Sequence, residues 1–159
     1  MVATSGDRLL AAEAVDALRT KLIPRASIIT PNLPEAAALL DEPLASGEAA
    51  IESQGKRLLS MGCRAVLIKG GHGQGAESTD YLISSTGTIA LAAPRIATEN
   101  THGTGCSLSS AIAAGLAKGE EMEAAVRKAK LWISAAIAAA DRFSVGHGHG
   151  PVHHFHGFY

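Results

Sequence analysis

Residues 46–73 read SGEAAIESQGKRLLSMGCRAVLIKGGHG and carry the clearest evidence for the fold class. Between Ser46, a typical N-cap residue, and Gly62, a typical helix terminator, the apolar residues recur at the spacing of one helix face. The run AVLI at 65–68 is short and apolar, as expected for a parallel strand buried on both faces. A helix followed by such a strand and a glycine-rich loop predicts an α/β domain.

Upstream of this stretch, helices and strands continue to alternate. Val15 belongs to an apolar stripe that predicts a helix ended by Pro24. The next run, ASIIT at 26–30, is short, apolar and β-branched, and it predicts a second buried parallel strand. Pro34 suits the first position of a short helix that extends through Leu40.

Downstream, a strand pair around a tight turn is expected, then a helix of small residues and a helix with an alanine-rich buried face. In order, these elements are 81–83, 88–91, about 106–118 and about 121–143. The last residues, 146–159, have no period. Because no repeat or linker divides the chain, we expect one domain over residues 1–159, an α/β sheet with helices packed on its faces.

The composition argues against several classes of partner. The 14 basic and 15 acidic residues nearly cancel, so no overall field attracts nucleic acid or a lipid surface. Aromatic residues make up only 4%, which leaves few side chains for base stacking. No apolar run approaches the roughly 20 residues of a membrane helix, and the start does not resemble a signal peptide. Cys63 and Cys106 form no disulfide framework, so we expect a reduced, cytoplasmic protein without nucleic-acid or membrane partners.

Gly103-Thr104-Gly105-Cys106 lies where the loop NTHGTG, residues 100–105, enters a helix. Glycines let several backbone N–H groups point one way, and the first N–H groups of a helix lack helical partners. Together with the helix dipole, they would form an anion hole for a phosphoryl group. Cys106 lies on the same turn, where a thiol loses its proton more easily, and could accept a proton from an attacking hydroxyl. The residues alone favour the simpler alternative, a loop-to-helix junction with a small buried cysteine.

Three further polar residues follow predicted strands. Lys69 leaves a strand before two glycines, where an ammonium group could reach a polyphosphate, although a lysine that merely ends a strand in solvent fits the spacing better. Asn32 and Glu35 could together face a magnesium-bound water. An equally good alternative makes Asn32 a helix N-cap, with Glu35 in the first turn.

The C-terminal segment is dense in histidine. Such density is compatible with zinc or nickel binding, and His149 and His153 are four residues apart. However, no cysteine or carboxylate nearby completes a ligand set, and Pro151 and glycines interrupt any helix. We therefore expect no metal site in this segment.

Four motifs in this order resemble one family. They are TPNLPE at 30–35, IKGGH at 68–72, THGTGCS at 101–107 and GHGHGPVHHF at 146–155. They look like hydroxymethylpyrimidine/phosphomethylpyrimidine kinase, a ribokinase-like family of thiamine biosynthesis. The wider superfamily usually has aspartate where this chain has Cys106, and the cysteine favours the pyrimidine kinase over pyridoxal kinase or sugar kinases.

The resemblance implies a three-layer α/β/α sandwich around a mainly parallel sheet, and a homodimer in the full-length family. It implies that Cys106 acts as the base on the substrate hydroxyl while Gly103, Thr104 and Gly105 complete the anion hole. Lys69 would contact ATP phosphates, and Asn32 and Glu35 would organise Mg²⁺ and its water. The substrates would be hydroxymethylpyrimidine and its monophosphate.

The resemblance also predicts that a part is missing. The family begins with further strand–helix units that carry the pyrimidine-binding segment, so the chain looks N-terminally truncated. Without that pocket, little or no turnover is expected from the isolated chain. A pyridoxal kinase-like enzyme and a non-catalytic nucleotide-binding or interaction remnant are the alternatives.

Overall fold

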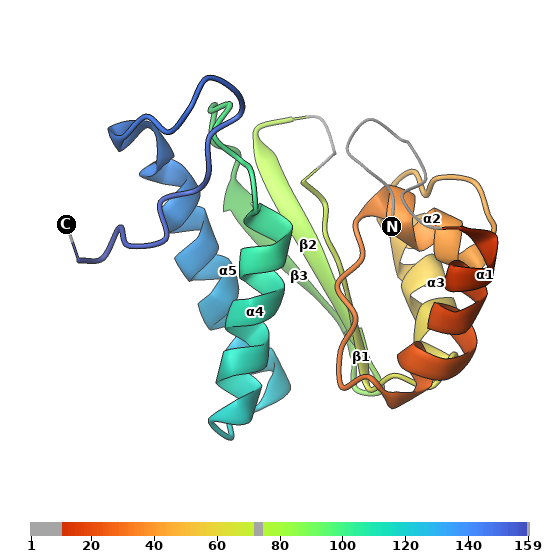
Figure 1. Ribbon diagram of the computed structural model, residues 1–159. Coiled ribbons are helices and arrows are strands. Elements are labelled where there is room, and N and C mark those ends of the chain that lie inside the picture. The colour runs from red at the N-terminus through yellow and green to blue at the C-terminus, as the bar shows by residue number, and fades with distance from the viewer. Residues whose placement is uncertain (1–10, 72–74, 159) are drawn as a thin grey trace. The chain divides into compact units, whose positions relative to one another are not determined.

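The computed structural model describes residues 11–71 and 75–158 (Figure 1). By its internal contacts the chain divides into two compact units, residues 1–92 and 93–159, and each is described by itself. The expectation of a single domain stays a prediction. Within the described part of the chain, no helix is long and apolar enough to cross a membrane.

The first unit combines helices with a small sheet. Its regular elements are α1 (Ala12–Ala17), α2 (Leu33–Leu40), α3 (Glu48–Leu59), β1 (Ala65–Ile68), β2 (Glu77–Ser84) and β3 (Gly87–Pro94), whose last two residues fall in the second unit. After α1 the chain continues through a π-helical turn, Leu18–Leu22, into a 3₁₀ turn, Ile23–Arg25, that contains Pro24. Helical backbone therefore continues to Arg25, one residue past the proline that was expected to end it, and the chain is extended from Ala26. Residues 1–10 lie outside the described part.

The sheet has the order β1-β2-β3. β1 and β2 pair antiparallel, with Ala65 opposite Ser84 and Ile68 opposite Tyr81. This differs from the expected mainly parallel sheet, because the connection between these strands is too short for a crossover helix and antiparallel strands need none. Within the first unit, a parallel bridge between Ile29 and Val66 joins β1 to the segment around Ile29.

The segment predicted as a strand at 26–30 is extended but not a full strand. Ile29 donates its N–H to Ala65 O at 3.1 Å and accepts from Leu67 N at 2.8 Å, and Arg64 N donates to Ala26 O at 3.4 Å. Within the described ranges this segment pairs only with β1, and its residues are half-buried or exposed rather than buried. A segment with one paired side lacks the full ladder and burial of a central strand.

The core of the first unit lies between its helices and β1. α3 packs against α2, β1 and β2, and Figure 1 shows α1, α2 and α3 gathered on one side of β1. The largest buried side chains here are Leu58, Val66, Leu67, Ile68 and Ile83. Gly47, not Ser46, is the N-cap of α3, with φ +81°. The serine prediction was wrong by one residue, because a glycine adopts this φ at little cost.

The second unit is built on two helices, α4 (Thr104–Ala117) and α5 (Met122–Ala138), followed by a 3₁₀ turn, Ala140–Arg142. They run side by side (Figure 1). The buried face of α5 is alanine-rich as predicted, with Ala125, Val126, Ala129, Ile133 and Ala136. Small residues allow close approach: a Cβ added at Gly115 of α4 would lie 3.0 Å from Ala125 Cβ. α5 ends at Ala138, earlier than the predicted residue 143, and the 3₁₀ turn follows from Ala140.

Candidate functional site

The first unit brings Lys69, Asn32 and Glu35 together. Asn32 and Lys69 form a parallel bridge, so the end of β1 lies beside the start of α2. Lys69 Nζ donates to Thr30 O at 2.6 Å and lies 3.8 Å from Glu35 Oε2. The side chain is about one-fifth exposed, so the lysine is not a strand terminator in open solvent.

The start of α2 is a reciprocal capping box. Asn32 Oδ1 accepts from Glu35 N at 2.7 Å, and Glu35 Oε2 accepts from Asn32 N at 2.8 Å. The N-cap alternative for Asn32 is therefore confirmed. Because a cap uses only part of the acceptor capacity of these oxygens, the magnesium role is compatible with it and stays a prediction.

The donor set of this turn suits a hydrated magnesium ion. Carboxylate and amide oxygens are the ligands that Mg²⁺ prefers, and the ion usually keeps several waters. Asn32 Oδ1 and Glu35 Oε2 are both only partly buried. An outer-shell role for these two residues fits the geometry, while the Lys69 ammonium beside Glu35 argues against direct coordination by that oxygen.

The backbone after Lys69 is held by a residue that the sequence did not indicate. Asp80, which is only 4% exposed on β2, accepts a hydrogen bond from Gly70 N at 2.9 Å. A Cβ added at Gly70 would lie 1.9 Å from Thr79 O, so the chain passes β2 more closely than any other residue type allows. The sequence feature that could have indicated this role is an acidic residue, Asp80, within a strand. His72 and Gly73 lie outside the described residues.

In the second unit, the glycine loop enters α4 as predicted. Gly103 is the N-cap with φ +82°, in the left-handed region. Ser107 N donates to Gly103 O at 2.9 Å, whereas the N–H of Thr104 is already engaged with Thr101 O at 3.3 Å. Among the described residues, the amides of Gly105 and Cys106 have no protein acceptor. Two amides at a helix N-terminus therefore remain available to an anion.

Cys106 is exposed, so the alternative of a small buried cysteine at this junction is wrong. It lines an open depression within the second unit together with Ser107, Ser110, Ala111, Trp132 and His154. Ser107 Oγ and His154 Nε2 are hydrogen-bonded at 2.7 Å, and the His154 ring lies 6.1 Å from that of Trp132. Cys63, by contrast, is buried, and burial raises the pKa of its thiol.

The histidines of the C-terminal segment serve separate local contacts. His149 Nδ1 contacts Glu99 O at 3.1 Å, and the ring of His153 meets Phe143 edge-on at 4.7 Å. No group of three or more metal-ligating side chains occurs in residues 11–71 and 75–158.

The predicted site residues thus form two local groups. The first unit holds Asn32, Glu35 and Lys69, and the second holds the 103–106 turn. Each group has a geometry suited to phosphate chemistry: an ammonium beside oxygen ligands in one, and available amides beside a thiol in the other.

Comparison with known proteins agrees with this chemistry. The chain matches the family described as Phosphomethylpyrimidine kinase over residues 1–153. It is 53% identical over 159 residues to the hydroxymethylpyrimidine/phosphomethylpyrimidine kinase of Salmonella typhimurium, covering 100% of this chain and 60% of the relative. The chain therefore spans about 60% of the length of such relatives.

Solved structures of two kinases show the structural similarity. The ADP complex of Bacillus subtilis pyridoxal kinase has a TM-score of 0.86 and 34% identity, over 92% of this chain and 57% of that one. Phosphomethylpyrimidine kinase from Clostridium difficile has a TM-score of 0.71 and 37% identity, over 86% and 54%. These neighbours confirm the ribokinase-like α/β fold.

Proposed function

This chain belongs to the phosphomethylpyrimidine kinase family, and from that premise we propose that it supplies the phosphate-handling part of an ATP-dependent pyrimidine kinase. The reaction transfers phosphate from ATP to hydroxymethylpyrimidine, and then to its monophosphate, in thiamine biosynthesis. The enzyme works in the cytoplasm, and the full-length form is a homodimer.

One observation carries the proposal: at the start of α4, the amides of Gly105 and Cys106 find no acceptor within residues 11–71 and 75–158, and an exposed thiol lies on the same turn. A phosphoryl group gathers negative charge on its oxygens as it is transferred, and preorganised N–H donors stabilise that charge. Cys106 Sγ takes the proton of the substrate hydroxyl as the hydroxyl oxygen attacks the γ-phosphorus of ATP, and ADP leaves as the bond between the β- and γ-phosphates breaks. Gly103 supplies the left-handed turn that aims the amides of Gly105 and Cys106.

The residues of the first unit handle the nucleotide. Lys69 gives up its contact with Thr30 O and binds ATP phosphate oxygens. Asn32 and Glu35 would hold Mg²⁺ through its waters, and the bound ion would supply positive charge against the phosphates. Support comes from the bound ADP of the Bacillus subtilis neighbour and from the oxygen donors of the capping box.

Nucleotide binding by the purified chain tests this assignment. We expect calorimetry with Mg-ATP to detect binding that Lys69→Met weakens on the order of 10- to 100-fold, the loss of one or two charge-assisted hydrogen bonds. Lys56→Met, on the exposed face of α3, is the matched control. Equal affinity of the two variants, or no binding at millimolar nucleotide, would refute the nucleotide role.

Turnover by the 159 residues alone should be low, since the chain corresponds to 60% of its relatives' length and substrate orientation needs a complete pocket. Hydroxymethylpyrimidine mixed with the chain and Mg-ATP is the assay. Rapid phosphate transfer would contradict the low-turnover proposal. Little or no phosphate transfer would support it.

A second candidate is a pyridoxal kinase-like enzyme, which the Bacillus subtilis neighbour favours. Comparing pyridoxal with hydroxymethylpyrimidine as acceptor, in a form that turns over, separates the two. A third is a non-catalytic remnant that needs a partner chain. A stable monomer on size-exclusion chromatography would argue against it.

A further inference from the structure

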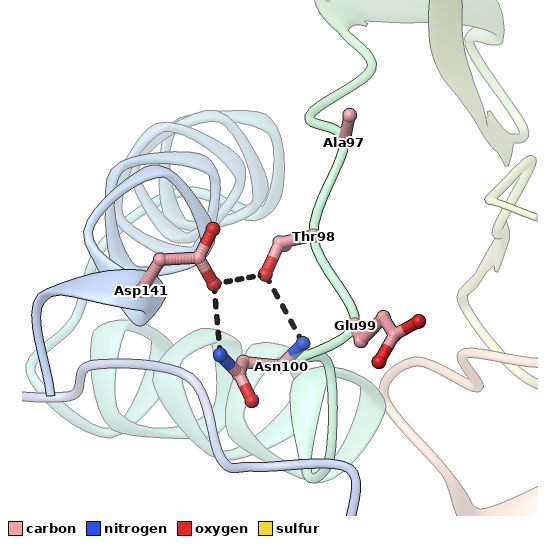
Figure 2. Close-up of a pocket in the computed structure, with 5 residues that line it drawn as sticks. All are labelled: Ala97, Thr98, Glu99, Asn100 and Asp141. Carbon is pink, nitrogen blue, oxygen red and sulfur yellow. Dashed lines mark hydrogen bonds between the residues drawn. The ribbon is translucent and has the colours of Figure 1, made fainter. Parts of the chain in front are cut away.

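Asp141 holds the loop 98–102 (Figure 2), which leads into residues 103–106, the turn proposed above to bind phosphate and called the phosphate-binding turn below. One carboxylate oxygen, Oδ1, accepts from Thr98 Oγ1 at 2.5 Å and from Asn100 Nδ2 at 2.8 Å. Thr98 Oγ1 in turn accepts from Asn100 N at 3.1 Å. Three residues of the second unit thus form a closed ring of hydrogen bonds, and all three line an open depression.

The other end of the Asn100 amide holds the C-terminal segment. Asn100 Oδ1 accepts from Gly150 N at 2.9 Å. A Cβ at Gly150 would lie 2.2 Å from that oxygen, so only glycine permits this approach. The bond to Asp141 therefore also fixes the orientation of the amide, because its NH₂ group must face the carboxylate while its oxygen faces Gly150.

Backbone pairing continues the contact toward α4. His102 N donates to Gly150 O at 3.0 Å, and Val152 N donates to His102 O at 3.4 Å. Val152 is fully buried, and His153 N donates to Ala136 O on α5 at 3.0 Å. The loop is therefore fixed to a segment that is itself anchored in the helix pair.

The loop is hydrogen-bonded to the phosphate-binding turn through the backbone carbonyl of Thr101. Thr101 O accepts from Thr104 N at 3.3 Å and from Thr104 Oγ1 at 2.7 Å. The position of Thr101 thus sets where α4 begins, and with it the direction of the next two amides.

We propose that Asp141 and Asn100 are positioning residues for the phosphate-binding turn. They clamp the loop 98–102 to the segment 150–152, so that the amides of Gly105 and Cys106 are aimed before phosphate arrives. The inference rests on the proposed function for the role of those amides, but the clamp itself does not. Preorganised donors bind an anion more tightly, because no conformational entropy is lost in ordering the loop when the anion binds.

Charge supports this assignment. Hydrogen bonds from Thr98 and, next, Asn100 lower the pKa of the Asp141 carboxyl, which means that they favour its ionised form, the stronger acceptor. Glu99 lies in the same depression, but its carboxylate points away from Asp141 (Figure 2).

Amide hydrogen exchange of the full 159-residue chain tests the clamp, with Asp141→Ala, Asp141→Asn and the control Glu99→Ala. We expect Asp141→Ala to accelerate exchange in peptides spanning 98–106 by about tenfold while the core of α5 exchanges as before. Asp141→Asn keeps an acceptor oxygen and should restore most of the protection, and Glu99→Ala should match wild type. Unchanged exchange in Asp141→Ala, or equal acceleration throughout α5, would overturn the clamp.

Pyrophosphate binding, measured by calorimetry on the same variants, separates the clamp from the proposed function. At a temperature where both proteins are folded, Asp141→Ala should bind pyrophosphate several-fold more weakly than wild type, and Asp141→Asn should recover the affinity. If Asp141→Ala exchanges faster in the loop but binds pyrophosphate with wild-type affinity, the positioning role is overturned. If wild type itself binds no pyrophosphate, the proposed function fails, and the positioning role that rests on it fails too. The exchange result still decides the clamp.

Discussion

Removing the N-cap of α2 tests how the first unit is built. In Asn32→Ala, Glu35 N loses its acceptor at 2.7 Å, while Glu35 Oε2 can still accept from the backbone of residue 32. Only one of the two reciprocal bonds is therefore lost. Ser46→Ala is the matched control, because Ser46 precedes α3 without capping it.

The expected cost follows from the single lost cap. Replacing an N-cap asparagine by alanine typically costs about 1 kcal/mol, with a range of about 0.5–2. The site is partly buried, so the unpaired N–H keeps some access to water and the central value applies. About 1 kcal/mol reduces the folding equilibrium constant roughly fivefold and lowers Tm by about 2–4 °C in a chain of this size.

Urea unfolding followed by circular dichroism measures the difference. We expect Asn32→Ala to lower the midpoint without changing the slope and Ser46→Ala to stay within about 0.5 kcal/mol of wild type. Equal losses in both variants, or a neutral Asn32→Ala, would refute the assignment of the cap to Asn32.

Three further outcomes are expected. Gly70→Ala should destabilise the chain by at least about 2 kcal/mol in urea unfolding, because the new Cβ meets backbone Thr79 O at 1.9 Å; a stable variant would contradict that packing. A thiol reagent should modify exposed Cys106 rapidly and buried Cys63 only at the rate of unfolding, as mass spectrometry of the peptides can show; equal rates would refute the burial. Burial raises the folded pKa of Cys63 above its ordinary 9.0, so its contribution to stability is full below that pH and is lost as the pH rises further. Between pH 8 and 10, the unfolding free energy of wild type should therefore fall more than that of Cys63→Ala. Equal falls in the two proteins would contradict the raised pKa of Cys63.

Local patterns predicted the regular elements well. The buried run AVLI forms β1 as expected, the two strands around the turn at 85–86 are present, and the alanine-rich face of α5 is buried. These features depend on periodicity and residue type within a few positions, which sequence shows directly.

Features that depend on tertiary contacts were harder to predict from the sequence. The segment at 26–30 has the composition of a central strand but pairs on one side within the described residues, and composition cannot report the number of neighbours. The clamp joins Asn100 to Asp141 and Gly150 across 41 and 50 positions of sequence, and no local spacing marks such a pair. The exposure of Cys106 likewise depends on what packs over the start of α4.

The most direct test of the phosphate-binding role is the backbone NMR spectrum of the chain during titration with Mg-ATP. We expect the amide signals of Gly105 and Cys106 to shift most within the second unit, because these donors gain an anionic acceptor. If those two signals stay in place while the nucleotide binds elsewhere, the start of α4 is not the phosphate site.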